Sequence, residues 1–392
     1  MTSLLCTFFA GSDPSMTGAP RSVLNLLSGL RRKGIRSTLI TERESEISRQ
    51  LCDSGVEVVI LPLPPILDVY DNKALAYSLA SKTKAAYSII RYSLRIKETA
   101  DDVGADCFWT RGIKGVLLTG PAAVLRKNPL IWDIGLERRS RGWILVLHLT
   151  GLLLSSRVIT QAEAQPRDIF GDTVAGFFAS KFKTIYPGIG DRRKRRLREA
   201  SQTLKSGREH DQIVVSVGSV HPRKNQLMLL AAINGLVKKF PRVRLYIVGP
   251  VKDEVYFEQL RSFVNVNSLE NHVEFLGWRE DIPELLGISD LMVLSSHREG
   301  VPHVIREAMF SEVPVVATSV GGVPEAIEDG ITGFLIKPDD VSALRVRIEE
   351  LLASPEKRER MGRAGFELAH ERFSKKVWLR EYYNLLYNVV NK

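Results

Sequence analysis

The chain has 392 residues, of which 44% are hydrophobic and 26% charged. This is ordinary globular composition and excludes wholesale disorder. No apolar run reaches the roughly 20 residues that a membrane-spanning helix needs, and the longest covers 143–154. The net charge of +10 is uneven: the first 200 residues carry +11 and the remainder −1. The three cysteines are odd in number and lack metal-ligand spacing, so we expect a reducing cytoplasm and no disulfide framework.

The first half of the chain alternates short apolar runs with helical patterns. A buried strand is expected over 4–10 and a loop rich in Gly, Ser, Asp and Pro over 11–20, followed by a helix that Gly34 closes. Later strands are expected over 38–41, 56–61, 107–110, 130–132 and 158–160, with a helix over 74–96. This alternation predicts a parallel sheet covered on both faces.

The pattern breaks near 185–191 and starts again after a basic stretch. We interpret 191–210 as a basic linker between an N-terminal domain, 1–190, and a C-terminal domain, 211–372. The second domain has strands expected over 213–217, 243–248, 273–276, 291–294, 313–317 and 334–336. The final segment, 373–392, contains an amphipathic helix over 377–390. The predicted fold class is α/β, with two Rossmann-like doubly wound domains that face a central cleft.

The most informative segment runs from 287 to 340. A buried strand leads through Glu299 and Gly300 into a helix, and Pro302 suits the first helical position. The amides that follow would form an anion site. Glu307 lies five residues after Pro302, about 7–8 Å along the helix axis. A diphosphate at the helix start would therefore have one carboxylate beside a sugar and the other beside a ribose. Alternatively, both glutamates are ordinary surface charges.

This segment, with its continuation through Gly321-Gly322 and Asp329-Gly330, resembles glycosyltransferase family 4, whose members are retaining GT-B enzymes. Roughly 150 residues of the C-terminal half match in order and spacing, while the N-terminal half is similar in outline. The resemblance implies that Glu299 binds hydroxyls of the donor sugar and Glu307 the nucleotide ribose. It places three backbone amides near the sugar and diphosphate, those of Gly300, His303 and Val304.

A second loop also follows a strand and opens a helix. By the resemblance, Gly218 and Ser219 lie at the donor, and Lys224 neutralises the diphosphate. The family usually carries Arg where Ser219 stands, so Arg223 is a candidate for the missing contact. A third loop, Trp278 and Arg279, corresponds to the nucleobase-binding loop, although Trp278 could instead belong to the core.

In the N-terminal half, the loop before the first helix resembles the family's glycine-rich loop, and its candidate contacts to acceptor or diphosphate are Gly18, Ala19 and Arg21. The histidine that many members carry near the reacting sugar is missing. Asp133 or Arg111 is a candidate for that neighbourhood, whereas His148 is expected to be a core residue.

The sequence has no Asp-x-Asp pair and no metal-ligand spacing, so neither a metal nor a cofactor is expected. The resemblance implies a retaining transferase that moves a sugar from a nucleotide-diphosphate sugar, such as a UDP- or GDP-sugar, to a glycan or lipid-linked acceptor in cell-surface polysaccharide or lipopolysaccharide synthesis. The basic first half, together with the apolar stretch 143–154, favours peripheral binding to an anionic membrane at its inner face. Alternatively, the basic runs are ordinary solvated loop or helix faces. No nucleic-acid motif is present. The alternatives are a nucleotide-sugar 2-epimerase, a sucrose- or glycogen-type transferase, and a non-catalytic module that binds a nucleotide sugar or an anionic surface.

Overall fold

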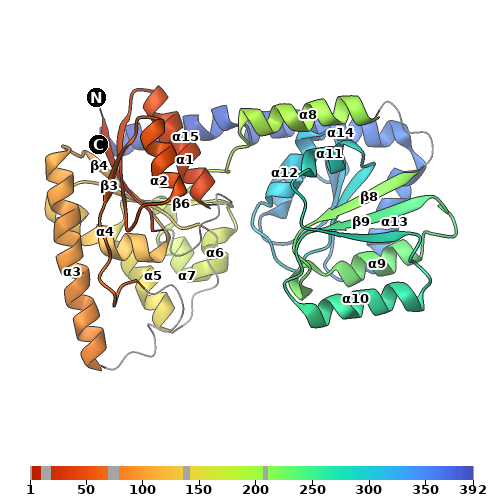
Figure 1. Ribbon diagram of the computed structural model, residues 1–392, viewed down its shortest axis with the longest axis horizontal. Helices are drawn as coiled ribbons and strands as arrows, with labels where there is room; N and C mark the ends of the chain where they lie inside the picture. The colour runs from red at the N-terminus through yellow and green to blue at the C-terminus, as the bar shows by residue number, and fades with distance from the viewer. Residues whose placement is uncertain (1, 10–18, 69–78, 136–141, 206–210, 392) are drawn as a thin grey trace. The chain divides into compact units, whose positions relative to one another are not determined.

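The computed structural model describes residues 2–9, 19–68, 79–135, 142–205 and 211–391. The chain forms two compact units. Unit 1 comprises Met1–Gln161, Gln165–Pro187 and Leu379–Lys392, and unit 2 comprises Ala162–Ala164 and Gly188–Trp378. Each unit is a parallel sheet with helices on both faces (Figure 1). This is the α/β fold class that the alternating pattern predicts.

The sheet of unit 1 has the strand order β3-β2-β1-β4-β5-β6-β7. The central strand β1 pairs in parallel with β2 and β4, so that Cys6 lies opposite Leu39 and Trp109. The apolar runs that predicted buried strands are buried on both faces, as a doubly covered parallel sheet requires. The strands are β1 (Ser3–Thr7), β2 (Arg36–Thr41), β3 (Glu57–Ile60), β4 (Cys107–Arg111), β5 (Leu130–Asp133), β6 (Arg157–Thr160) and β7 (Phe182–Thr184).

Helices cover this sheet in two layers. One layer, α3 (Leu79–Asp102), α4 (Gly112–Arg126) and α5 (Trp143–Leu154), shares a hydrophobic core with the sheet. The other contains α1 (Ala19–Arg32), α2 (Glu46–Asp53) and the part of α15 (Lys375–Val390) that belongs to unit 1. There Gly29 of α1 lies directly against Leu379, so a side chain at position 29 would collide with α15. Two short helices complete the unit, α6 (Gln165–Phe170) and α7 (Asp172–Phe177).

The sheet of unit 2 has the order β10-β9-β8-β11-β12-β13. Helices α9, α10 and α13 cover one face and α8, α11, α12 and α14 the other (Figure 1). The strands are β8 (Gln212–Val217), β9 (Val243–Val248), β10 (Val273–Gly277), β11 (Leu291–Leu294), β12 (Val315–Thr318) and β13 (Gly333–Ile336). The helices are α8 (Asp191–Lys205), α9 (Gln226–Asn234), α10 (Glu254–Val266), α11 (Ile282–Gly287), α12 (His303–Phe310), α13 (Val341–Ala353) and α14 (Pro355–Arg372).

The linker expected over 191–210 is wrong for its first fifteen residues. These residues form α8, which packs on α11 and belongs to unit 2. Leu197 and Ala200 recur at helical spacing and are buried, and Ala200 approaches Gly287 so closely that a side chain there would not fit. The many basic residues lower the mean hydropathy and conceal this narrow apolar stripe.

Two further observations concern the chain as a whole. In the part that the structure describes, no helix combines the length and the apolar character required to cross a bilayer. Cys6, Cys52 and Cys107 are free thiols, and burial raises the pKa of Cys107 to about 12. Among the loops singled out from the sequence, Gly18 lies outside the described residues.

Candidate functional site: the carboxyl edge of the unit 2 sheet

Two of the predicted donor loops of unit 2 meet where β8 and β11 end. The strands are parallel, so their carboxyl ends meet at one edge of the sheet. There Lys224 Nζ donates to Glu299 Oε1 at 2.6 Å, although the two residues are 75 positions apart in the chain. Both side chains are largely buried, at 14% and 10% exposure. The sequence placed the two residues in separate motifs, and the fold makes them one ion pair.

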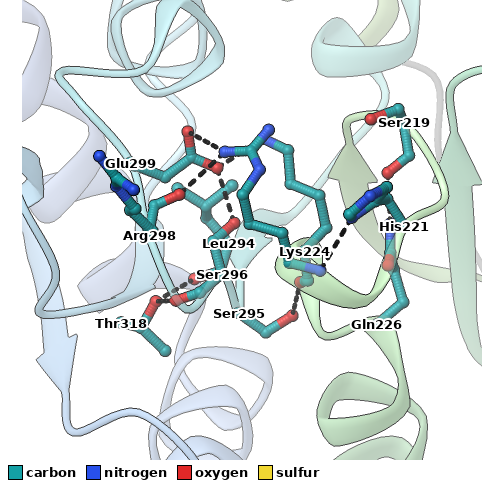
Figure 2. Close-up of polar contacts among 11 residues, drawn as sticks. Ser219, His221, Lys224, Gln226, Leu294, Ser295, Ser296, Arg298, Glu299 and Thr318 are labelled. Carbon is teal, nitrogen blue, oxygen red and sulfur yellow. Dashed lines mark hydrogen bonds and ion pairs between the residues drawn. The ribbon is translucent and has the colours of Figure 1, made fainter. Parts of the chain in front are cut away.

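Glu299 is fixed by its own loop and by the loop after β12. Ser296 Oγ donates to Glu299 Oε1 at 2.8 Å, and Thr318 Oγ1 donates to the Ser296 carbonyl at 2.5 Å (Figure 2). Behind the loop, Gly321 has a φ of +52°, and a Cβ there would lie 1.9 Å from the Glu299 carbonyl oxygen. The glycine is therefore required so that the β12 loop can support Glu299 from behind.

Lys224 is held by a set of side chains that sequence reasoning missed. Ser295 Oγ donates to the carbonyls of Lys224 and Asn225 at 3.0 and 2.9 Å. Asn225 has a left-handed φ of 49°, and its Nδ2 lies 2.9 Å from both His297 Nε2 and Asp339 Oδ1. His297 Nε2 also lies 2.8 Å from Asp339, and this contact lowers the pKa of the Asp339 carboxyl. The only sequence signal was the position of these polar residues at strand ends.

The contacts of Arg223 and Ser219 bear on the departure from the family pattern. Arg223 Nη1 donates to the Arg298 carbonyl at 2.9 Å and lies 3.6 Å from Glu299 Oε2. A guanidinium thus stands beside the same carboxylate as Lys224. The Ser219 carbonyl accepts from Gln226 Nε2 at 3.0 Å, which ties the loop to α9 (Figure 2). A Cβ on Gly249 would lie 2.2 Å from the Gly218 carbonyl oxygen, so no side chain fits at position 249, where the chain leaves β9 beside the Gly218 loop.

The second predicted glutamate lies on α12. The expectation that Pro302 is the first helical residue is wrong by one position, because Pro302 is extended and caps a helix that begins at His303. At the start of this helix His303 is exposed and Val304 is buried. Glu307 Oε1 accepts from Arg193 Nε of α8 at 2.8 Å. An ionised carboxylate can accept about four hydrogen bonds, so this ion pair leaves Glu307 capacity for further donors.

The loop after β10 presents Trp278 to solvent, with 65% of the side chain exposed. The alternative that Trp278 belongs to the core is therefore wrong. Arg279 donates to both carboxylate oxygens of Asp281 at 2.8 and 2.6 Å. This ion pair fixes the loop just after Gly277, whose φ is +63°.

The predicted residues of unit 1 form a separate group at the carboxyl edge of its own sheet. Ala19 and Arg21 open α1, and Arg21 is exposed. Asp133 is buried at the end of β5, where its Oδ2 accepts from Tyr382 of α15 at 3.1 Å and lies 3.7 Å from Arg111. Burial and the nearby carboxylate raise the pKa of Tyr382 well above its ordinary value. Asp133 therefore anchors α15.

His148 is a core residue, as expected from its apolar surroundings. Its Nδ1 lies 2.8 Å from the Ile144 carbonyl, and its ring packs between Trp132 and Phe170. Within the described residues, no group of three or more His, Cys, Asp and Glu side chains is arranged to hold a metal ion.

A cavity of about 560 Å³ lies at the opposite, amino edge of the unit 2 sheet. It is lined by charged residues of both signs, among them Asp211, Lys239, Asp290 and Arg358. Parallel α/β sheets bind ligands at their carboxyl edge. The buried Lys224–Glu299 pair is also absent from this cavity, so we place the candidate site at the carboxyl edge.

Two doubly wound parallel α/β units in one chain are the architecture of the GT-B fold. Solved structures share it: a UDP complex of Anabaena HepE aligns with 99% of this chain and 100% of that one, at a TM-score of 0.76 and 22% identity. Residues 200–368 match the family described as glycosyl transferases group 1.

Two named relatives match less than half of the chain. The EpsD protein of Bacillus subtilis (strain 168) is 37% identical over 162 residues, 41% of this chain and 42% of EpsD. The lipopolysaccharide core biosynthesis glycosyltransferase LpsE of Rhizobium meliloti (strain 1021) is 28% identical over 174 residues, 44% of this chain and 49% of LpsE. The chain therefore matches less than half the length of these two relatives.

Proposed function

We propose that this protein is a glycosyltransferase that moves a sugar from a nucleotide-diphosphate sugar to an acceptor hydroxyl. The observation that carries the proposal is the buried Lys224–Glu299 ion pair, with Arg223 beside it, at the carboxyl edge of unit 2. Lys224 and Arg223 supply positive charge for a diphosphate, and Glu299 supplies an acceptor for sugar hydroxyls. The match of residues 200–368 to the family described as glycosyl transferases group 1 supports the same activity.

In this proposal the three charged side chains exchange partners when the donor binds. The diphosphate takes over contacts of Lys224 and Arg223, and the sugar hydroxyls donate to Glu299. As the bond between the anomeric carbon and the diphosphate breaks, negative charge grows on the leaving group. Positive groups that are already fixed beside it stabilise that charge without reorganisation. The two cations thus replace the divalent ion that the chemistry would otherwise call for.

The donor subsites follow the arrangement of the loops. We propose that the start of α12 faces the diphosphate, that Glu307 accepts from the ribose, and that Trp278 stacks on the base. The exposure of Trp278 and the acceptor capacity of Glu307 support these roles. HepE was crystallised with UDP, which makes UDP-sugars the first donors to test.

We further propose that the anomeric configuration is retained. In this proposal the acceptor hydroxyl attacks from the face that the diphosphate leaves, since no motif in the sequence marks a covalent nucleophile. One C–O bond forms as the other breaks, and the hydroxyl proton passes to the departing phosphate oxygen. Proton NMR of the new linkage measures the anomeric configuration directly, and an inverted product would refute this step.

The acceptor is proposed to be a glycan or lipid-linked glycan of the cell surface, reached by a protein that binds peripherally at the inner face of the membrane. The match to LpsE supports the lipopolysaccharide class, and the basic N-terminal half supports proximity to anionic lipid. The following section assigns the surface involved.

The activity is tested in two stages. A thermal-shift screen of UDP, GDP and their sugars identifies the donor, because a bound ligand raises the unfolding temperature. Release of nucleoside diphosphate is then measured with and without acceptor. A transferase needs the acceptor, an epimerase releases nucleotide or forms the epimer without it, and a binding module does neither.

Matched variants connect the activity to the site. Glu299→Gln removes the acceptor charge and should abolish turnover while nucleotide binding stays measurable. Lys224→Met should lower turnover by about 10²–10³. Lys239→Met, in an exposed ion pair with Glu349 on the same unit, serves as the control and should leave turnover unchanged. Unchanged turnover in Glu299→Gln would refute the assignment.

A further inference from the structure

Helix α5 of unit 1 has an outer face made of uncovered apolar side chains. Trp143 and Leu153 are about 70% exposed (71% and 70%), and Val146 and Leu147 are exposed between them. The inner side of the helix is packed, with His148 and Leu152 buried. None of its twelve residues is charged. A helix that is apolar on both sides is typical of one that contacts two apolar environments.

The same layer of helices carries an apolar stripe bordered by basic residues. On α3, Tyr87, Ile90 and Leu94 are exposed and recur at helical spacing, so they share one face. Exposed basic residues flank the stripe, Lys82, Lys84, Arg91 and Arg95. The Arg91 guanidinium lies 6.0 Å from the centre of the Tyr87 ring. From residue 79 to 97, α3 has five basic residues and no acidic one.

The acidic residues of α3 lie at its other end. Asp101 pairs with Lys97 and with Arg126 of α4. Helix α4 packs against both α3 and α5, and its own Val124 and Leu125 are exposed. Away from this acidic end, the outer surface of the layer is therefore apolar and cationic. Figure 1 shows the three helices in unit 1.

We propose that this outer surface of α3, α4 and α5 docks onto an anionic lipid membrane. The proposal extends the proposed function, because it assigns the surface that brings the enzyme to a lipid-linked acceptor. Helix α5 is about 18 Å long, too short for a hydrocarbon core of about 30 Å, so it lies in the interfacial plane with Trp143 at headgroup level. The basic residues of α3 attract anionic headgroups.

Lipid fits this surface better than a protein partner does. The apolar residues are spread over three helices, and from residue 79 to 97 of α3 there is no acidic side chain that could pair with a basic group of a protein partner. Basic residues beside an apolar face that includes aromatic rings are the arrangement of interfacial helices. Lys181 Nζ donates to the carbonyls of Leu152 and Ser155 at 2.7 Å and so closes the C-terminal end of α5, which keeps the helix intact at the surface.

The test is co-sedimentation of the full chain with vesicles of phosphatidylcholine, with or without phosphatidylglycerol. We expect binding only when phosphatidylglycerol is present, and weaker binding at high ionic strength. Because no nucleotide sugar is used, loss of docking and loss of transferase activity are observed separately. If the chain ignores phosphatidylglycerol vesicles, the docking proposal is overturned and the transferase proposal stands.

Two double variants locate the surface. Lys84→Glu with Arg91→Glu, and Trp143→Gln with Leu153→Gln, should each weaken vesicle binding by tenfold or more, since each basic residue contributes about fivefold. The control substitutes exposed residues of unit 2, Lys238→Glu with Val266→Gln, and should bind like the wild type. Equal binding by all variants overturns the assignment. All six positions are exposed, and unchanged circular dichroism confirms folding.

A spectroscopic readout gives the depth of Trp143. In a Trp278→Phe background the other three tryptophans are buried, so bromine-labelled lipid should quench Trp143 fluorescence selectively. Absence of quenching in bound protein would show that another surface docks. Light scattering distinguishes self-association: if the α5 variant lowers the oligomeric state and leaves vesicle binding unchanged, the surface is a protein interface and the proposal fails.

Discussion

Removing Lys224 should destabilise unit 2 because it leaves a largely buried carboxylate without its closest cation. Breaking a buried ion pair by removing one partner costs about 3–5 kcal/mol. Here Glu299 keeps the Ser296 hydroxyl at 2.8 Å and the Arg223 guanidinium at 3.6 Å. These remaining contacts offset part of the loss, so we expect Lys224→Met to lower the free energy of unfolding by about 2–3 kcal/mol.

A double-mutant cycle separates the ion pair from its surroundings. Glu299→Gln alone leaves a buried ammonium group, whereas Lys224→Met with Glu299→Gln leaves two neutral side chains of similar size. We therefore expect the double variant to be more stable than Lys224→Met, with a coupling energy of about 2 kcal/mol. Native-state hydrogen exchange of β8 and β11 measures this in unit 2 alone, which avoids assuming that the two units unfold together.

The matched control is the exposed ion pair Lys239–Glu349, which has the same N–O distance of 2.6 Å in the same unit. Its side chains are more exposed, at 63% and 35%, so the corresponding cycle should give no more than about 0.5–1 kcal/mol. If the two cycles gave the same coupling energy, burial would not be what makes the Lys224–Glu299 pair strong, and the reasoning would be refuted.

Three further predictions concern other contacts. Gly321→Ala should lower the free energy of unfolding by more than about 2 kcal/mol and displace Glu299, because the new Cβ would meet the Glu299 carbonyl. The control, Gly330→Ala, is also at positive φ but has open space around it and should cost only about 1 kcal/mol. Equal costs in urea denaturation would contradict the clash. Burial lowers the pKa of Lys114 to about 8, so between pH 8 and 10.5 the unfolded chain binds more protons than the folded protein and the free energy of unfolding should rise with pH. Lys114→Met should flatten that rise in urea titrations. An unchanged dependence on pH would contradict this prediction. Tyr382→Phe removes the hydrogen bond to Asp133 and should speed hydrogen exchange in α15 by about tenfold, equivalent to about 1.5 kcal/mol, whereas exposed Tyr387→Phe should not change it.

The sequence alone determined the doubly wound α/β class and the loops that carry the candidate site. Short apolar runs bounded by glycine and proline predict strands, because a strand that is buried on both faces of a sheet needs apolar residues throughout. The order of strand, loop and helix then places Glu299, Lys224 and Trp278 at the carboxyl ends of strands. The sequence did not predict the helix over 191–205, because its many charged residues obscured the apolar stripe of α8. At Pro302 it predicted the start of the helix one residue too early, because proline suits both the cap position and the first turn.

Only the tertiary structure decided which of these residues act together. Lys224 and Glu299 lie in loops that follow β8 and β11, strands adjacent in the sheet but separated by β9 and β10 in the chain, so their contact depends on strand order. The pairing of Glu307 with Arg193 and of Asp133 with Tyr382 likewise depends on which helix covers which edge. Side-chain exposure is also a property of the folded molecule: it brought Trp278 to the surface and left one side of α5 uncovered, because a helix pattern specifies its own faces but not what lies against them.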